Sequence, residues 1–121
     1  MNQDWKQMTV DMSGAVKELR TGHPELMKAF SAMARAALEP RALDSKTKEL
    51  IALGISVAVR CDACVAFHAE AAVKRGATRD EIMETMGMAV YMGAGPSVMY
   101  AALAVEAFDQ FKGSTPAAAA A

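Results

Sequence analysis

The apolar residues of this chain are mostly alanine and methionine, and this choice constrains its fold more than any other feature. The 121-residue sequence holds 26 alanines and 10 methionines, whereas aromatic residues make up only 6% of it. Alanine and methionine favour helix, while β-strands are enriched in β-branched and aromatic side chains. The chain has a single Asn and no Asn-Gly or Asp-Gly pair, so the strongest β-hairpin signal is absent. We therefore expect an all-α fold.

Glycine, proline and capping residues divide the chain into about six expected helices. Pro24 can open the second helix, and Asp44 is a suitable N-cap for the third. Gly76 ends the fourth helix, and Thr78 with Glu81 fits a capping box before the fifth. The expected helices cover residues 4–20, 24–38, 44–59, 61–75, 78–92 and 96–110. They predict a single helical-bundle domain over residues 1–121, in which 112–121 form a flexible tail.

Charge and hydropathy disfavour several classes of partner. The net charge is -1 and the 13 basic residues are scattered, which favours neither nucleic acid nor anionic membrane. The apolar stretch 50–59 is shorter than the roughly 20 residues that span a bilayer, and no apolar signal-peptide segment is visible at the N-terminus. We expect a cytoplasmic protein. The third helix has so little polar surface that we expect it inside a bundle or at a subunit interface.

Both cysteines and one of the two histidines lie in the stretch "RCDACVAFHAE", residues 60–70. On a helix, Cys61, Cys64 and His68 follow one another at spacings of three and four residues and share one face. The spacing of the cysteines leaves their Cα atoms within the roughly 4.4–6.8 Å that a disulfide bridges. We expect Cys61 in the first helical turn, where the positive end of the helix dipole favours the thiolate.

A carboxylate is expected to face this histidine. The third and fourth helices meet at a tight turn near Arg60, so they should form an antiparallel hairpin. Glu49 lies eleven residues before the turn and His68 eight after it. At about 1.5 Å of rise per residue, the two side chains are placed to approach each other across the hairpin. A Glu–His pair beside a thiol is a proton relay, which is what a nucleophilic cysteine needs.

The spacing of Glu49, Cys61, Cys64 and His68 resembles the active-site signature of the alkylhydroperoxidase D-like branch of the carboxymuconolactone decarboxylase family. The stretch "ALDSKTKELIALGISVAVRCDACVAFHAEAAVKRGATRDEIMETM" is similar to the core of that family, and "GAGPSVMYAALAVEAF" resembles its final helix. The similarity covers about residues 24–111.

The resemblance implies a small all-helical protein that assembles as a homotrimer or homohexamer. It implies that Cys64 is the thiol activated through His68 and Glu49, and that Cys61 is the resolving thiol. The implied chemistry is reduction of hydroperoxides, or electron transfer between thiol proteins, with an external dithiol or thiol-protein reductant and without flavin, haem or metal. The decarboxylase branch lacks the cysteine pair. Asp62 lies between the cysteines, where some members carry a histidine, and its negative charge opposes thiolate formation.

Other interpretations of the cysteine pair are a buried apolar pair, a structural zinc site, and a redox sensor without turnover. Zinc needs four ligands, whereas one helical face offers three here. Cys61 and His68 are separated by about 10 Å of helix axis, too far for one ion. We therefore favour a thiol-dependent alkylhydroperoxidase, with a thiol–disulfide electron carrier or a redox-sensing helical oligomer as the alternatives.

Overall fold

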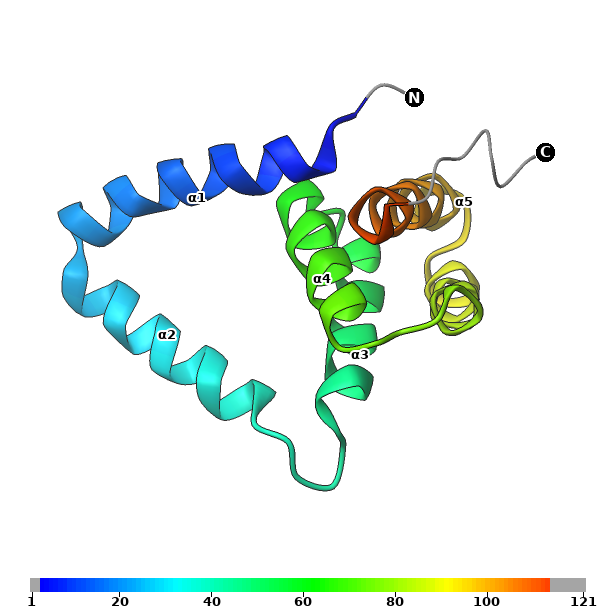
Figure 1. Ribbon diagram of the computed structural model, residues 1–121, viewed down its shortest axis with the longest axis horizontal. Coiled ribbons are helices and arrows are strands. Elements are labelled where there is room, and N and C mark those ends of the chain that lie inside the picture. The colour runs from blue at the N-terminus through cyan, green and yellow to red at the C-terminus, as the bar shows by residue number, and fades with distance from the viewer. Residues whose placement is uncertain (1–2, 114–121) are drawn as a thin grey trace.

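The computed structural model describes residues 3–113, whose regular structure is entirely helical (Figure 1). The predicted all-α fold is therefore confirmed. Helices α3, α4 and α5 pack against one another and form the body of the molecule (Figure 1). The start of α1 packs on α4 and α5, and α2 returns toward the start of α3. The helices are α1 (Trp5–Gly22), α2 (Pro24–Leu38), α3 (Ser45–Ala58), α4 (Asp62–Lys74) and α5 (Arg79–Lys112).

The capping residues start the helices where the sequence predicted. Pro24 is the first residue of α2, and the Asp44 carboxylate accepts a hydrogen bond from the Thr47 N–H at the start of α3. Thr78 and Glu81 form a complete capping box at the start of α5. These local bonds satisfy N–H groups that a helix leaves without partners in its first turn. The helix starts are therefore set by short-range chemistry.

The last two predicted helices form one kinked helix, α5. Its direction changes at Ala94, whose backbone angles (φ 54°, ψ -140°) are not helical. Pro96 lies just behind the kink, in the first turn of the new segment, where its missing N–H removes no helical bond. Gly93 is required there, because a Cβ would overlap with the side chain of Ser97. The predicted break is therefore present, but as a sharp bend instead of a loop between separate helices.

The core of the body combines a few large side chains with many alanines. Leu53 and Val57 of α3 and Ile82 and Phe108 of α5 are fully buried. Small side chains let helix axes approach closely, so α4 packs tightly between its neighbours. The alanines buried in α4 and α5 are Ala66, Ala69, Ala72, Ala89, Ala101, Ala104 and Ala107.

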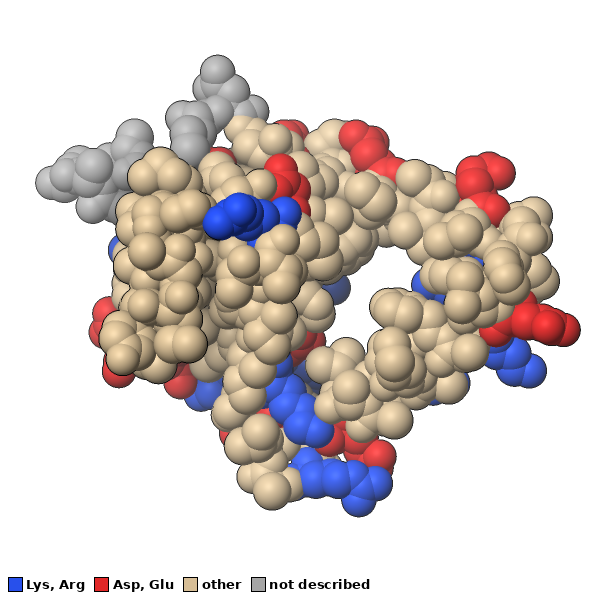
Figure 2. Space-filling model, turned by 180° about the vertical axis from the view of Figure 1, so that it is seen from behind, with Lys and Arg blue, Asp and Glu red and all other residues tan. Residues whose placement is uncertain are grey.

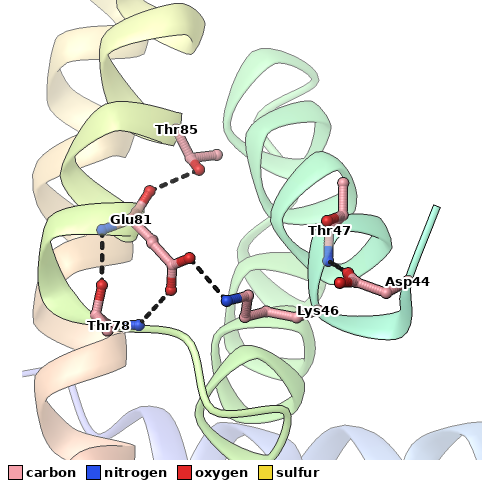
Figure 3. A network of polar contacts seen from close by, with 6 residues as sticks. All are labelled: Asp44, Lys46, Thr47, Thr78, Glu81 and Thr85. Carbon is pink, nitrogen blue, oxygen red and sulfur yellow. Dashed lines mark hydrogen bonds and ion pairs between the residues drawn. The ribbon is translucent and has the colours of Figure 1, made fainter.

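A polar network joins the starts of α3 and α5 (Figure 3). The Lys46 ammonium lies 2.8 Å from the Glu81 carboxylate, which also accepts the N–H of Thr78. The Lys46 contact and the Thr78 N–H together hold the pKa of Glu81 below its usual value. The Thr85 hydroxyl donates to the Glu81 carbonyl one turn further along α5. This network ties the start of α3 to the start of α5.

Trp5 fixes the start of α1 to the end of α5. Its indole is 1% exposed and donates to the Glu106 carboxylate at 2.8 Å. Its backbone N–H donates to the Gln110 side chain, also at 2.8 Å. A single large side chain thus anchors a helix that otherwise buries only Thr9.

Helix α5 contains a longer apolar segment than the stretch 50–59. An 18-residue window within α5 has a mean hydropathy of 1.4 and is 22% buried, so by length and composition the helix could cross a membrane. Core helices of soluble proteins meet the same criterion. The segment of α5 that follows the kink carries Glu106, Asp109 and Lys112, so it is too charged to supply such a window alone. The window therefore includes the kink. We therefore interpret the exposed apolar side of α5 as a packing surface.

Replacing Trp5 should detach α1 from the body. Trp5→Ala should lower the free energy of unfolding by about 3–5 kcal/mol, since it empties a buried site. Trp5→Phe should lower it by about 1–3 kcal/mol, because it leaves the Glu106 carboxylate without its donor. Urea unfolding followed by circular dichroism measures both. Val10→Ala, on the exposed side of α1, is the control and should change stability by less than about 0.5 kcal/mol. Equal effects of all three variants would contradict the anchoring role.

Candidate redox site

The candidate site lies at the turn between α3 and α4. The backbone of Arg60 is left-handed, with φ 58°, at the centre of this turn. The Arg60 N–H donates to the Val57 carbonyl at 3.2 Å, and the Cys61 N–H donates to the Ser56 carbonyl at 3.1 Å. These two bonds form a Schellman turn, which ends α3 and reverses the chain at once. Helix α4 consequently runs back along α3 (Figure 1).

The two cysteines are joined in a disulfide bond at this turn. Their Cα atoms are 5.2 Å apart, inside the range that the spacing predicted. Cys61 is the N-cap of α4 and not a first-turn residue as expected, because its backbone is extended (φ -104°, ψ 100°). Its sulfur accepts the Cys64 N–H at 3.2 Å. Both sulfurs therefore lie at the positive end of the α4 dipole, which favours negative charge on either.

Glu49 and His68 meet across the hairpin, so the predicted approach of the two side chains is confirmed. The Glu49 carboxylate lies 2.7 Å from His68 Nδ1. Glu49 is only 6% exposed, whereas the His68 side chain is 31% exposed. A carboxylate acceptor keeps a proton on Nδ1, so Nε2 of the neutral ring is left as the acceptor. Cys64 precedes His68 by one turn on the same face of α4. The catalytic roles assigned to these residues stay predictions.

Tyr100 is a residue of the site that the sequence did not indicate. It comes from the second segment of α5 and its hydroxyl faces the Asp62 carboxylate. The bond to Asp62 and partial burial raise the pKa of the Tyr100 hydroxyl, and the positive charge of Arg60 acts in the opposite direction. Asp62, Arg60 and Tyr100 therefore converge beside the disulfide. The phenol of Tyr100 is visible in the sequence, but the kink that orients it is a tertiary feature.

Metal binding was the sharpest alternative for the cysteine pair. Within residues 3–113, no group of three or more His, Cys, Asp and Glu side chains is arranged to hold a metal ion. The described site thus consists of a disulfide, a Glu–His pair and a rim of charged and hydroxyl groups.

The profile of the carboxymuconolactone decarboxylase family matches residues 24–107 of the chain. The chain belongs to this family. The match includes both cysteines, Glu49 and His68, and it extends over the body of the molecule and α2.

Uncharacterised bacterial relatives of this family protein share most of its length. A Haemophilus influenzae protein is 39% identical over 106 residues, which are 88% of this chain and 94% of the relative. A Cupriavidus necator protein is 35% identical over 109 residues, 90% of this chain and 96% of the relative. A protein from the cox locus of Paracoccus denitrificans is 31% identical and covers 84% and 92% of the two chains.

Solved structures of family members have the same fold. A carboxymuconolactone decarboxylase family protein from Legionella pneumophila superimposes with a TM-score of 0.87 at 51% identity, covering 89% of this chain and 96% of its own. A Thermotoga maritima family member with a possible part in the antioxidative response gives a TM-score of 0.78 at 28% identity, covering 87% and 90%. The arrangement of helices is therefore that of the family, and it is consistent with the redox branch.

Glu49 should determine which nitrogen of His68 carries the proton. In the wild-type protein we expect the neutral His68 ring to hold its hydrogen on Nδ1. Glu49→Leu removes the acceptor and should abolish this preference, because the tautomer follows the hydrogen bond of the ring. Long-range ¹H–¹⁵N NMR of the labelled protein measures the tautomer directly. Glu70→Leu, on the same helix, is the control. An Nδ1–H signal that persists in Glu49→Leu would show that another group orients the ring.

Proposed function

We propose that this protein is a thiol-dependent oxidoreductase that reduces organic hydroperoxides through Cys64 and Cys61. The observation that carries the proposal is a pair of cysteines able to close a disulfide, one turn from a histidine that a buried carboxylate orients. A solved relative with a possible part in the antioxidative response supports the same chemistry.

The first half of the reaction oxidises Cys64. In the reduced protein, His68 Nε2 accepts the thiol proton, and the resulting thiolate attacks the outer oxygen of the hydroperoxide. The O–O bond breaks, the sulfur takes up the oxygen as a sulfenic acid, and the leaving alkoxide receives the proton from His68. The products of this step are one alcohol and Cys64 sulfenic acid. Glu49 stabilises the positive charge that the imidazole carries between the two proton transfers.

The second half closes and reopens the disulfide. The Cys61 thiolate attacks the sulfur of the sulfenic acid and expels hydroxide, which leaves as water after protonation. The resulting bond joins Cys61 and Cys64, the pair that is bridged in this structure. An external dithiol or thiol protein then returns two electrons and two protons by thiol–disulfide exchange. Such a cycle suits the reducing cytoplasm, and we expect the working form to be a homo-oligomer, a trimer or a hexamer.

A thiol–disulfide electron carrier is the second candidate. Asp62 lies between the cysteines, and its negative charge opposes thiolate formation and slows attack on a peroxide. The same pair could still exchange with the disulfide of a partner protein, since exchange works best when the thiol pKa is near the ambient pH. The two candidates use the same residues and differ in the oxidant.

Reaction of the reduced protein with one equivalent of cumene hydroperoxide tests the proposal. The wild type should lose two thiols quickly and form an intramolecular disulfide. Cys61→Ser should accumulate a sulfenic acid that dimedone traps, because Cys64 remains, whereas Cys64→Ser should react slowly and trap nothing. Free-thiol assays and intact mass follow both products.

The other outcomes separate the alternatives. Thiols that survive the peroxide but exchange rapidly with a protein disulfide would make the protein an electron carrier. Thiols inert toward both reagents would contradict a catalytic role altogether. Sulfenic acid on Cys61 in place of Cys64 would reverse the two assignments.

A further inference from the structure

Helix α2 presents an apolar stripe that the rest of the chain leaves uncovered. Leu26, Phe30 and Met33 follow one another at helical spacing and are 51%, 52% and 61% exposed. Ala37 continues the stripe and is also exposed. Met27 is the sole residue of α2 that is buried. An amphipathic helix of this kind gains most of its stability from packing its apolar face, so the stripe requires a partner.

The arm formed by α1 and α2 stands away from the body. Figure 2 shows an opening that passes through the molecule, and Figure 1 shows that the arm closes it on one side and the body on the other. Polar contacts hold α2 at its middle and at its C-terminal end. Arg20 donates to the Ser31 hydroxyl, and the Lys48 ammonium donates to the carbonyls of Ala37 and Glu39 at 2.8 and 2.6 Å. The stripe is therefore pre-positioned although it is uncovered.

A second uncovered apolar surface lies on the body, between α3 and α5. It is a groove of about 460 Å³. Ile51, Ile55, Met88 and Met92 on its rim are exposed. Glu49 and Leu53 face the interior of the hairpin, so the groove occupies a different side of α3 from the Glu–His pair. The groove is lined by Thr47, Leu50, Ile51, Gly54, Ile55, Ala58, Thr85, Met88, Ala89 and Met92.

The stripe and the groove have the same length. On α3 the groove extends from Thr47 to Ala58, and on α2 the stripe extends from Leu26 to Ala37. At about 1.5 Å per residue, each is roughly 17 Å long. An amphipathic helix laid in an apolar groove, with anchors at i, i+4 and i+7, is a common recognition mode. Every copy of the chain supplies one stripe and one groove.

We propose that α2 of one copy lies in the α3–α5 groove of a second copy. Each copy gives one arm and receives one, so the contact can close a reciprocal pair or a ring. In a reciprocal pair the two copies of the contact join the same two chains, so the areas that they bury add up. The contact covers Met88 and Met92, and the lining of the groove does not include the cysteine pair. It does not depend on the proposed redox function.

Light scattering with size-exclusion chromatography on the full chain tests this contact. The wild type should elute as an oligomer, whereas Phe30→Glu and Ile55→Glu should each dissociate it at micromolar concentration with unchanged helical content. Val10→Glu, an exposed apolar residue on α1 outside both surfaces, should leave the oligomer intact. A monomeric wild type, or an oligomer that survives both substitutions, would overturn the proposal.

Cross-linking identifies which surfaces meet. In a Cys61→Ser, Cys64→Ser background, Met33→Cys and Ile55→Cys proteins are mixed, allowed to exchange subunits, and oxidised. The mixture should form a disulfide-linked heterodimer that neither protein forms alone. Efficient linkage within the Met33→Cys protein alone would mean that α2 packs against α2, which would overturn the assignment.

A second inference comes from the turn before the cysteines. Helices α3 and α4 end in the same way. At the end of α4, the Gly76 N–H donates to the Val73 carbonyl and the Ala77 N–H to the Ala72 carbonyl, both at 3.0 Å. The left-handed residue is Gly76 in one turn (φ 83°) and Arg60 in the other (φ 58°). Glycine adopts this conformation without strain, whereas a residue with a Cβ does so at a cost.

The strained arginine lies next to the redox pair. It directly precedes Cys61, and its charge acts on the Tyr100 hydroxyl together with that of Asp62. His68, one turn after Cys64 on α4, and its partner Glu49 on α3 are further titratable groups of the site. A strained residue is retained at functional sites when its side chain is needed there.

We infer that Arg60 is a positioning residue whose positive charge offsets Asp62 and favours the thiolate of the reduced cysteine pair. This inference rests on the proposed redox function, because it assigns a use to the reduced thiols. A cation beside a thiol stabilises the thiolate, and the exposed side of the turn leaves the guanidinium free to approach it.

Alkylation of the reduced protein by iodoacetamide at pH 7, measured alongside the melting temperature, tests this role without any peroxide. Arg60→Gly should raise the melting temperature and slow alkylation several-fold, while Arg60→Lys should keep the wild-type rate. Gly76→Arg should lower the melting temperature and leave the rate unchanged, and Asp62→Asn should accelerate alkylation. An unchanged alkylation rate in Arg60→Gly, or the same slowing in Arg60→Lys as in Arg60→Gly, would overturn the inference. Neither result would bear on the peroxide reaction, which the cumene hydroperoxide experiment tests separately.

Discussion

Close packing of α4 against α3 and α5 is the constraint on which the site depends. The faces of α4 and α5 that meet in the core are largely alanine, including Ala66, Ala69 and Ala104. Small side chains allow the backbones to approach, and the Glu49 carboxylate then reaches His68 Nδ1 directly. Larger residues on these faces would separate the helices and lengthen this contact. The geometry of the Glu–His pair is thus a consequence of the small size of the core side chains.

The same choice limits what the core contributes to stability. An alanine buries much less apolar area than leucine or phenylalanine, and the hydrophobic contribution scales with that area. Among the described residues, the large side chains that are fully buried are few, with Trp5, Phe108 and Leu53 among them. Meanwhile Met88 and Met92 of α5 and the stripe of α2 remain exposed. An assembly that covers these surfaces would supply apolar burial that one copy lacks, which connects the alanine-rich core to the proposed contact between copies.

Burial of Glu49 fixes the orientation of the His68 ring. A carboxylate that is almost fully buried needs hydrogen-bond donors, and His68 Nδ1 supplies one. The ring itself is partly exposed, and its Nε2 is left as the acceptor. At the rim, the charges of Arg60 and Asp62 oppose each other next to the sulfurs. The thiolate is therefore subject to three influences, namely the helix dipole, the imidazole and the rim charges, and no single one needs to be strong.

Much of the fold and most of the site could be predicted because they depend on local chemistry. Caps such as Asp44 and Thr78, and the glycine after α4, act within one helical turn and are visible in the sequence. The position of Cys61 was wrong by one residue, since an N-cap and a first-turn residue differ only in backbone angles. The break near Pro96 was recognised, but the direction of the bend at Ala94 depends on what packs around it.

The sequence by itself determined that the chain is helical, where its helices begin, and that two cysteines and a histidine share one helical face. These properties repeat every few residues, so the 3.6-residue period of the helix is enough to establish them. Only the tertiary structure decided that Tyr100 faces Asp62, that Arg60 is strained, and that α2 stands away from the body. These depend on the angles of turns and kinks, where small backbone differences become large displacements further along the chain.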